Sequence, residues 1–132
     1  MDILELMREH GYEHSGDYSN KVVKAEQDLG LSFAEDFREF LLSFGQTDIE
    51  NHEITGVVLD NFLNVVVATM DERQYTHSDT KNMYVIENLG FDGLVIWQNT
   101  SGEIFQTVPD KLVKPEKIYN TLVEYFKNEV FY

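Results

Sequence analysis

The sequence predicts an α+β fold, formed by a single domain of residues 1–132 with N-terminal helices and a C-terminal helix packed on a mostly antiparallel sheet. Three observations favour it. Apolar residues recur at helical spacing before residue 45 and after residue 115. Short apolar segments separated by glycine-containing turns fill 83–108, as in an antiparallel meander. A 132-residue chain with 42% hydrophobic residues is also large enough for one conventional core.

Two helices are expected before residue 31. The first begins near Ile3 and should end near Gly11. A polar connection follows, and the second helix should begin at Ser19 or Asn20. Gly30 stands where this helix ends, because glycine readily adopts the left-handed conformation of a C-terminal cap.

The third helix has the clearest local signature. Ser32 and Glu35 match a capping box, in which each side chain satisfies a free amide of the other residue. The helix should end at Gly45. Its aromatic residues recur at helical spacing and predict a core face; they are Phe33, Phe37, Phe40 and Phe44.

The middle of the chain is less regular. Residues 47–59 have a short, strand-like pattern. Residues 63–70 keep helical spacing after a possible cap at Asp60 or Asn61. A helix is favoured here, but the β-branched residues 65–67 leave a strand as the alternative.

The last third predicts three strands and a helix. The strands are expected at 83–87, 94–98 and 103–108, and the helix at 116–128. Trp97, the only tryptophan, alternates with its neighbours along the second strand. It is expected to pack under a helix; an exposed interface aromatic is the alternative.

Negative charge is concentrated in the middle of the sequence. Residues 25–72 hold eleven acids and one base, Arg38, and carry ten of the fourteen excess negative charges. A field of one sign repels nucleic acid and anionic membranes and attracts basic surfaces. We therefore expect a basic protein partner, with no direct contact to nucleic acid or membrane. The alternative is that the charge only keeps the protein dispersed.

The partner-binding residues are expected among acids on loops or at the ends of elements, where binding residues are over-represented. For each of them the alternative is a solvated surface charge. The predicted residues are Asp48, Glu50, Glu53, Asp60, Asp71 and Glu72.

No motif predicts catalysis, a cofactor or a metal. The chain has no cysteine, which excludes disulfides, thiol nucleophiles and cysteine zinc sites. His10 and His14 have a ligand-like spacing, but Gly11 interrupts the helix and no third ligand is obvious. His52 and His77 lie in polar loops without an evident role. The sequence contains no nucleophile elbow or phosphate loop, so we expect no enzyme activity.

The expected location is the cytoplasm. The first residues include acids and lack the basic start and apolar region of a secretory signal. No window approaches the ~20 apolar residues needed to cross a bilayer.

Residues 22–45 resemble the N-terminal motif of the SUKH superfamily, the cell-wall assembly regulator-like proteins common among bacterial toxin-immunity genes. Glu26 precedes a Leu29-Gly30-Leu31 stretch, and a helix with spaced aromatics then ends at Gly45. The chain departs from the family at Ser32, near which the family often has proline. Later landmarks that look similar are Gly56, 69–73, Val85-Ile86, Leu89-Gly90, Asp92-Gly93, Gly102-Glu103-Ile104 and Phe126.

The resemblance implies a non-enzymatic immunity protein, or antitoxin, that neutralises a partner toxin of a bacterial polymorphic-toxin system by binding it. Many toxins paired with this superfamily are nucleases, whose substrate clefts are basic, so an acidic inhibitor suits them. The alternative is a regulatory scaffold domain that binds cellular proteins. A third possibility is an enzyme acting on a cationic small molecule.

Overall fold

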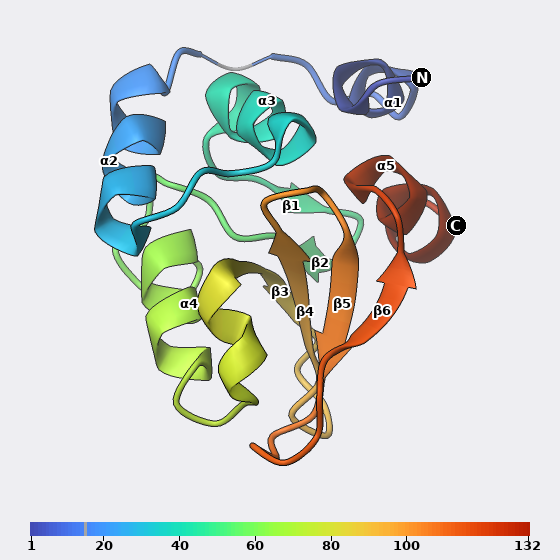
Figure 1. The fold of residues 1–132 in the computed structure, drawn as a ribbon. Helices are drawn as coiled ribbons and strands as arrows, with labels where there is room; N and C mark the ends of the chain where they lie inside the picture. The colour runs from blue at the N-terminus through green and yellow to red at the C-terminus, as the bar shows by residue number, and fades with distance from the viewer. Residues whose placement is uncertain (15) are drawn as a thin grey trace.

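Three helices form the first third of the chain in the computed structural model, which describes residues 1–14 and 16–132 (Figure 1). They are α1 (Ile3–Glu9), α2 (Ser19–Leu29) and α3 (Glu35–Phe44). The Asp2 side chain begins α1 by accepting a hydrogen bond from the Glu5 amide at 2.8 Å. Gly30 ends α2 with a φ of 67°, which confirms the predicted left-handed cap.

The capping box predicted from Ser32 is wrong. Ala34, in extended conformation, is the residue that precedes α3, and its side chain forms no cap. Distant residues satisfy the amides in this segment instead. The Phe33 amide donates to Glu26 of α2, and the Ala34 amide donates to the Tyr84 hydroxyl, both at 2.8 Å. Tertiary contacts thus replace the local cap.

The strand-like segment after α3 forms a hairpin whose two strands have two residues each. Strand β1 (Asp48–Ile49) pairs with β2 (His52–Glu53) in antiparallel register. The turn residues Glu50 and Asn51 have φ values of 55° and 98°, and two positive values are typical of a tight type I′ turn. Ile49 is fully buried and anchors the hairpin to the core.

The next segment is helical, as favoured, and forms α4 (Val65–Glu72). Its cap is Asn64 rather than Asp60 or Asn61. The Asn64 side chain accepts from the amides of Val66 and Val67, at 2.9 and 3.4 Å. This cap explains why a β-branched run forms a helix here.

The sheet has four antiparallel strands in the order β3-β4-β5-β6. The first three confirm the predicted meander, and a short 3₁₀ segment, η1 (Ser78–Asn82), leads into β3. The fourth strand, β6, consists of residues that were predicted to begin the last helix. It forms a strand because Lys117 and Tyr119 pair with Phe105 and Ile104 of β5. The strands are β3 (Met83–Asn88), β4 (Val95–Asn99), β5 (Ile104–Thr107) and β6 (Glu116–Tyr119).

The C-terminal helix therefore begins later than predicted. Thr121 caps α5 (Leu122–Tyr125) by accepting from the Glu124 amide at 3.1 Å. The chain continues as one wider turn, η2 (Phe126–Val130). Figure 1 shows α5 beside β6 and α1, with helices covering the sheet in the predicted α+β arrangement.

The two faces of the sheet contact different apolar clusters. Tyr84 and Ile96 face the larger cluster, beneath α1, α2, α3 and α5. Val85 and Trp97 face a smaller cluster with Ala68 of α4. Trp97 is fully buried, and its indole nitrogen donates to Thr107 at 2.8 Å, which confirms its predicted packing role.

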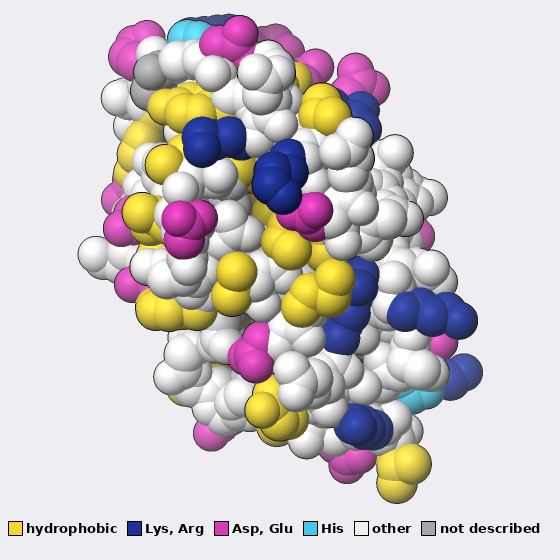
Figure 2. Space-filling model, turned by 90° about the vertical axis from the view of Figure 1, so that its left-hand side faces the viewer, with side chains coloured by type: hydrophobic (Ala, Val, Ile, Leu, Met, Phe, Trp, Pro, Cys, Tyr) yellow, Lys and Arg dark blue, Asp and Glu magenta, His cyan; other side chains and the backbone are white. Residues whose placement is uncertain are grey.

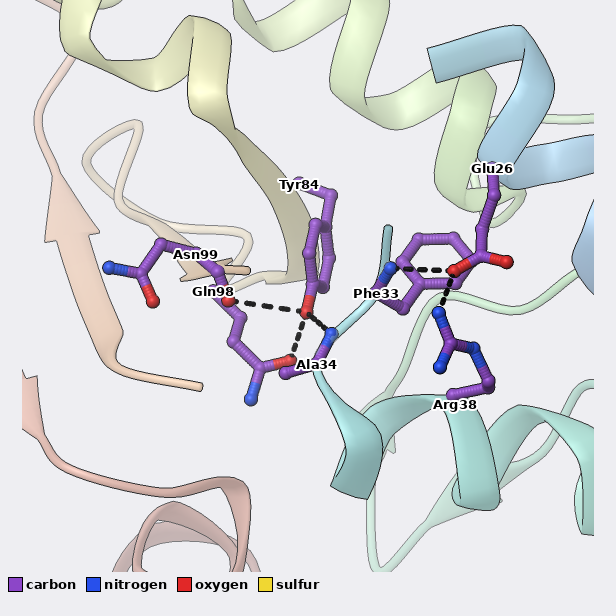
Figure 3. Close-up of polar contacts among 7 residues, drawn as sticks. All are labelled: Glu26, Phe33, Ala34, Arg38, Tyr84, Gln98 and Asn99. Carbon is purple, nitrogen blue, oxygen red and sulfur yellow. Dashed lines mark hydrogen bonds and ion pairs between the residues drawn. The ribbon is translucent and has the colours of Figure 1, made fainter. Parts of the chain in front are cut away.

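The Tyr84 hydroxyl is the buried link between the sheet and α3 (Figure 3). It accepts from the Ala34 amide and donates to the Gln98 side chain of β4. Close by, Glu26 of α2 forms an ion pair with Arg38 of α3. These contacts fix the start of α3 against the sheet.

Candidate protein-interaction site

The β1–β2 hairpin carries three of the predicted acids. Asp48 and Glu53 are directly opposite in register, and both are exposed. Glu50 lies at the exposed tip, where its amide donates to the Tyr12 hydroxyl at 3.1 Å. Like charges placed opposite each other destabilise a strand pair. Among the described residues, no Lys or Arg nitrogen lies within 4.0 Å of these three carboxylates, so they remain available to an external cation.

Two more predicted acids lie at the end of α4. Asp71 is exposed, and Glu72 is half-buried. Burial raises the pKa of Glu72, and the Asp71 charge raises it further. The Asn88 side chain partly offsets this by donating to Glu72 at 3.1 Å. An ionised Glu72 is thus held where its charge is unfavourable for the protein alone.

The fold brings Glu53 and Glu72 to one cleft of about 200 Å³ between α4 and β3, which we call the α4–β3 cleft. Apolar side chains, including Leu63 and Ala68, form much of its lining. Phe62, at the same cleft, is 67% exposed. An exposed aromatic residue beside carboxylates that have no Lys or Arg partner among the described residues suits a protein-binding surface.

Asp60 lies apart from the other predicted acids. It lines a hollow between α2 and α4 together with Lys21, Lys24 and Val67. Figure 2, which views the molecule from the side of α2 and α4, shows basic, acidic and apolar side chains mixed on this face. The predicted set therefore does not form one continuous surface.

A second acidic surface was missed from the sequence. A groove of about 680 Å³ lies where α1, α3, the β4–β5 turn and the start of α5 meet; we call it the acidic groove. Burial raises the pKa of Glu39 in this groove, and neighbouring carboxylates raise it further. The sequence placed the acids of α3 on a solvated face, and nothing local predicted that others would join them. The acids that line the acidic groove are Asp2, Glu35, Asp36, Glu39 and Glu124.

Asp36 has a structural role in the acidic groove. It accepts from the Gln98 side chain at 3.0 Å and from the Leu122 amide at 3.1 Å. It therefore joins α3 to β4 and to the first turn of α5. Glu35 and Glu39 form no ion pair with a Lys or Arg among the residues that the structure describes.

His52 contradicts its sequence interpretation as a lone loop histidine. Its Nδ1 lies 2.9 and 3.0 Å from the two carboxylate oxygens of Glu87, which is 2% exposed. The Tyr125 hydroxyl of α5 donates to the same carboxylate. This buried cluster ties the hairpin to β3 and α5, and so fixes the position of the hairpin acids.

Within residues 1–14 and 16–132, no group of three or more His, Cys, Asp or Glu side chains has the arrangement of a metal site. His10 instead stacks on Phe131, with ring centroids 3.9 Å apart. In the same part of the chain, no helix combines the length and apolar character needed to cross a membrane.

The sequence matches a known protein family over most of its length. Residues 19–126 match the family SUKH_6, described as SMI1-KNR4 cell-wall. The matched region includes all six predicted acids and the α4–β3 cleft. No curated protein matches the chain.

Proposed function

The chain belongs to the SUKH_6 family, described as SMI1-KNR4 cell-wall, and from this we propose that it is an immunity protein that binds and neutralises a basic toxin of a bacterial polymorphic-toxin system. One observation carries the proposal. Glu53 and Glu72 meet the exposed Phe62 at one cleft, beside the other hairpin acids. The cleft thus combines charge with an apolar anchor.

Its mode of action is occlusion in the cytoplasm, where the toxin is neutralised one to one without any covalent step. A nuclease toxin suits this mechanism, because its substrate cleft is basic. Electrostatic fields of opposite sign accelerate the association of the two proteins and favour the correct partner. Exposed charges at the rim contribute little affinity each, so Phe62 and the half-buried Glu72 should carry more of it than Asp48 or Glu50.

The alternative is a regulatory scaffold that binds cellular proteins. The α2–α4 face favours it, since the exposed Val67 lies there with Lys21 and Lys24 and with Asp28 and Asp60. That face offers a second surface, of mixed charge, which a protein joining two partners would need. A toxin gene next to the gene for this chain supports immunity, whereas the scaffold reading expects none.

A matched pair of charge reversals tests the proposal. The triple variant D48K/E50K/E53K changes the hairpin, and E35K/E39K/E124K makes the same change of charge in the acidic groove. Stopped-flow association with the neighbouring toxin domain should be at least about tenfold slower for the hairpin variant at low salt. The difference should shrink above about 0.15 M salt, where screening acts within ~8 Å.

The groove variant controls for net charge. It should slow association less than the hairpin variant does. Equal rates for the hairpin variant and the unmodified protein would remove the hairpin from the interface. A larger loss in the groove variant would move the interface to the acidic groove.

A further inference from the structure

We propose that the α4–β3 cleft receives one lysine or arginine side chain of the partner, with its aliphatic stem against Phe62 and its cation at Glu53 and Glu72. This rests on the proposed function, because it names the chemistry by which the partner is recognised. Three features of the cleft support it: its size, its remaining hydrogen-bonding capacity and its fixed geometry.

The size of the cleft fits one long side chain. Its volume of about 200 Å³ is less than a third of the 680 Å³ of the acidic groove, so it suits one side chain better than a larger ligand. Leu63, Ala68 and Val85 supply apolar lining, which an aliphatic stem covers favourably. Phe62 is exposed at the same cleft, where its ring can cover the aliphatic stem.

The polar groups of the lining select for a donor. Thr55 already donates to the Val85 carbonyl at 2.7 Å. Asn88 is used twice, donating to Glu72 at 3.1 Å and accepting from the Gly90 amide at 2.8 Å. Asn88 keeps one further N–H, but most of the side-chain capacity that remains belongs to the two ionised carboxylates, which accept only. No Lys, Arg or His lines the cleft in the part of the chain that the structure describes, which disfavours an anion.

The geometry of the cleft is fixed before binding. The Gly56 amide donates to the Leu63 carbonyl, and the Val65 amide donates back to Gly56, both at 2.9 Å. The Asn61 side chain also accepts from the Leu63 amide at 2.9 Å. These bonds hold the loop that carries Phe62, so little ordering is needed when a side chain enters.

The test is a titration of the isotope-labelled full chain with Nα-acetyl-lysine N-methylamide, followed by amide chemical shifts at low salt. Nα-acetyl-norleucine N-methylamide is the matched probe, because it has the stem without the cation. The lysine probe should shift amides at Phe62, Leu63, Glu72 and Asn88. E53Q/E72Q should weaken this binding by at least about tenfold, or about 1.4 kcal/mol.

Two further variants keep the result interpretable. E35Q/E39Q removes charge from the acidic groove and should leave lysine binding unchanged. F62A removes the exposed ring and should weaken binding even if E53Q/E72Q is poorly folded. Equal binding of the norleucine probe, unchanged binding by E53Q/E72Q, or shifts centred on the acidic groove would each overturn the proposal.

The outcomes also separate this inference from the proposed function. Slower toxin capture by D48K/E50K/E53K, together with no binding of the lysine probe, would reject the cleft as a lysine site and retain immunity. Specific lysine binding without capture of any neighbouring toxin would retain the site and reject immunity.

Discussion

Glu87 and His52 lie 35 residues apart in the sequence, yet both carboxylate oxygens of Glu87 lie within 3.0 Å of the His52 Nδ1. Glu87 is buried on β3, and His52 belongs to the hairpin that carries the predicted interface acids. The Tyr125 hydroxyl completes the cluster from α5. One buried carboxylate therefore sets where the acidic hairpin stands relative to the core.

Replacing Glu87 by Ala should lower the free energy of unfolding by about 3 kcal/mol, because the polar groups that contact this buried carboxylate are left without a partner. His52 and Tyr125 would both lose their acceptor. Asp28→Ala is the control, since its pair with Lys24 is solvent-exposed and worth under about 1 kcal/mol. Urea unfolding measures the free energy of unfolding of both variants. Similar losses in the two variants would show that the buried cluster does not hold the hairpin.

Glu72→Gln should stabilise the protein at pH 7. The raised pKa means that the folded state holds this proton more tightly than the unfolded chain does. The resulting stability is fully present below the ordinary pKa of 4.5 and is lost as the pH rises through the folded value. Thermal unfolding should therefore show a gain for E72Q at pH 7 that disappears below pH 4.5.

Glu103→Gln is the control of opposite sign. Hydrogen bonds from Lys117 and Asn99 lower the pKa of Glu103, so its stabilising effect is present above the ordinary value and lost as the pH falls through the folded one. E103Q should be slightly less stable at pH 7 and equal to the unmodified protein in acid. If E72Q also lost stability at pH 7, ionised Glu72 would stabilise the fold. It would then lack the destabilising effect that we expect of a residue kept for binding.

Tyr84→Phe should cost about 1–3 kcal/mol, because it leaves a buried donor at Ala34 and a buried acceptor at Gln98 without this partner. Tyr119→Phe removes a hydroxyl that bonds Glu129 at the surface and should change stability by less than about 0.5 kcal/mol. Denaturant midpoints of the two variants give the comparison. Equal midpoints would contradict the role of Tyr84 as the link to α3.

Gly56→Ala should be among the most damaging small substitutions. An added Cβ would lie 2.3 Å from the Gly45 carbonyl oxygen, so backbone would have to move, and with it the loop carrying Phe62. Gly30→Ala meets no atom within 4 Å and costs only the strain of a positive φ, about 1 kcal/mol. Thermal unfolding should show a larger loss for Gly56. An equal loss would mean that the Gly56 loop adapts easily.

Local patterns predicted most of the fold. The aromatic spacing of α3, the glycine after α2 and the alternation around Trp97 each depend on neighbours in sequence, and each matches the structure. The predictions failed where a distant partner decided the outcome. Glu26 and Tyr84 took over the cap expected from Ser32.

The prediction of where the last helix begins was wrong for a similar reason. Pairing with β5 made residues 116–119 a strand, although apolar spacing there also fitted a helix. At the candidate site, the charge run identified the acids but not their grouping. Only the folded chain places Glu53 beside Glu72, sends Asp60 to another face, and buries Glu87 against His52.

The most direct test of the proposed immunity function is co-expression of this protein with the toxin encoded by the neighbouring gene. A one-to-one complex in a pull-down and restored growth of the poisoned cells are expected. D48K/E50K/E53K should weaken both, and E35K/E39K/E124K should do so less. Failure to bind or rescue against every neighbouring toxin would contradict the immunity function.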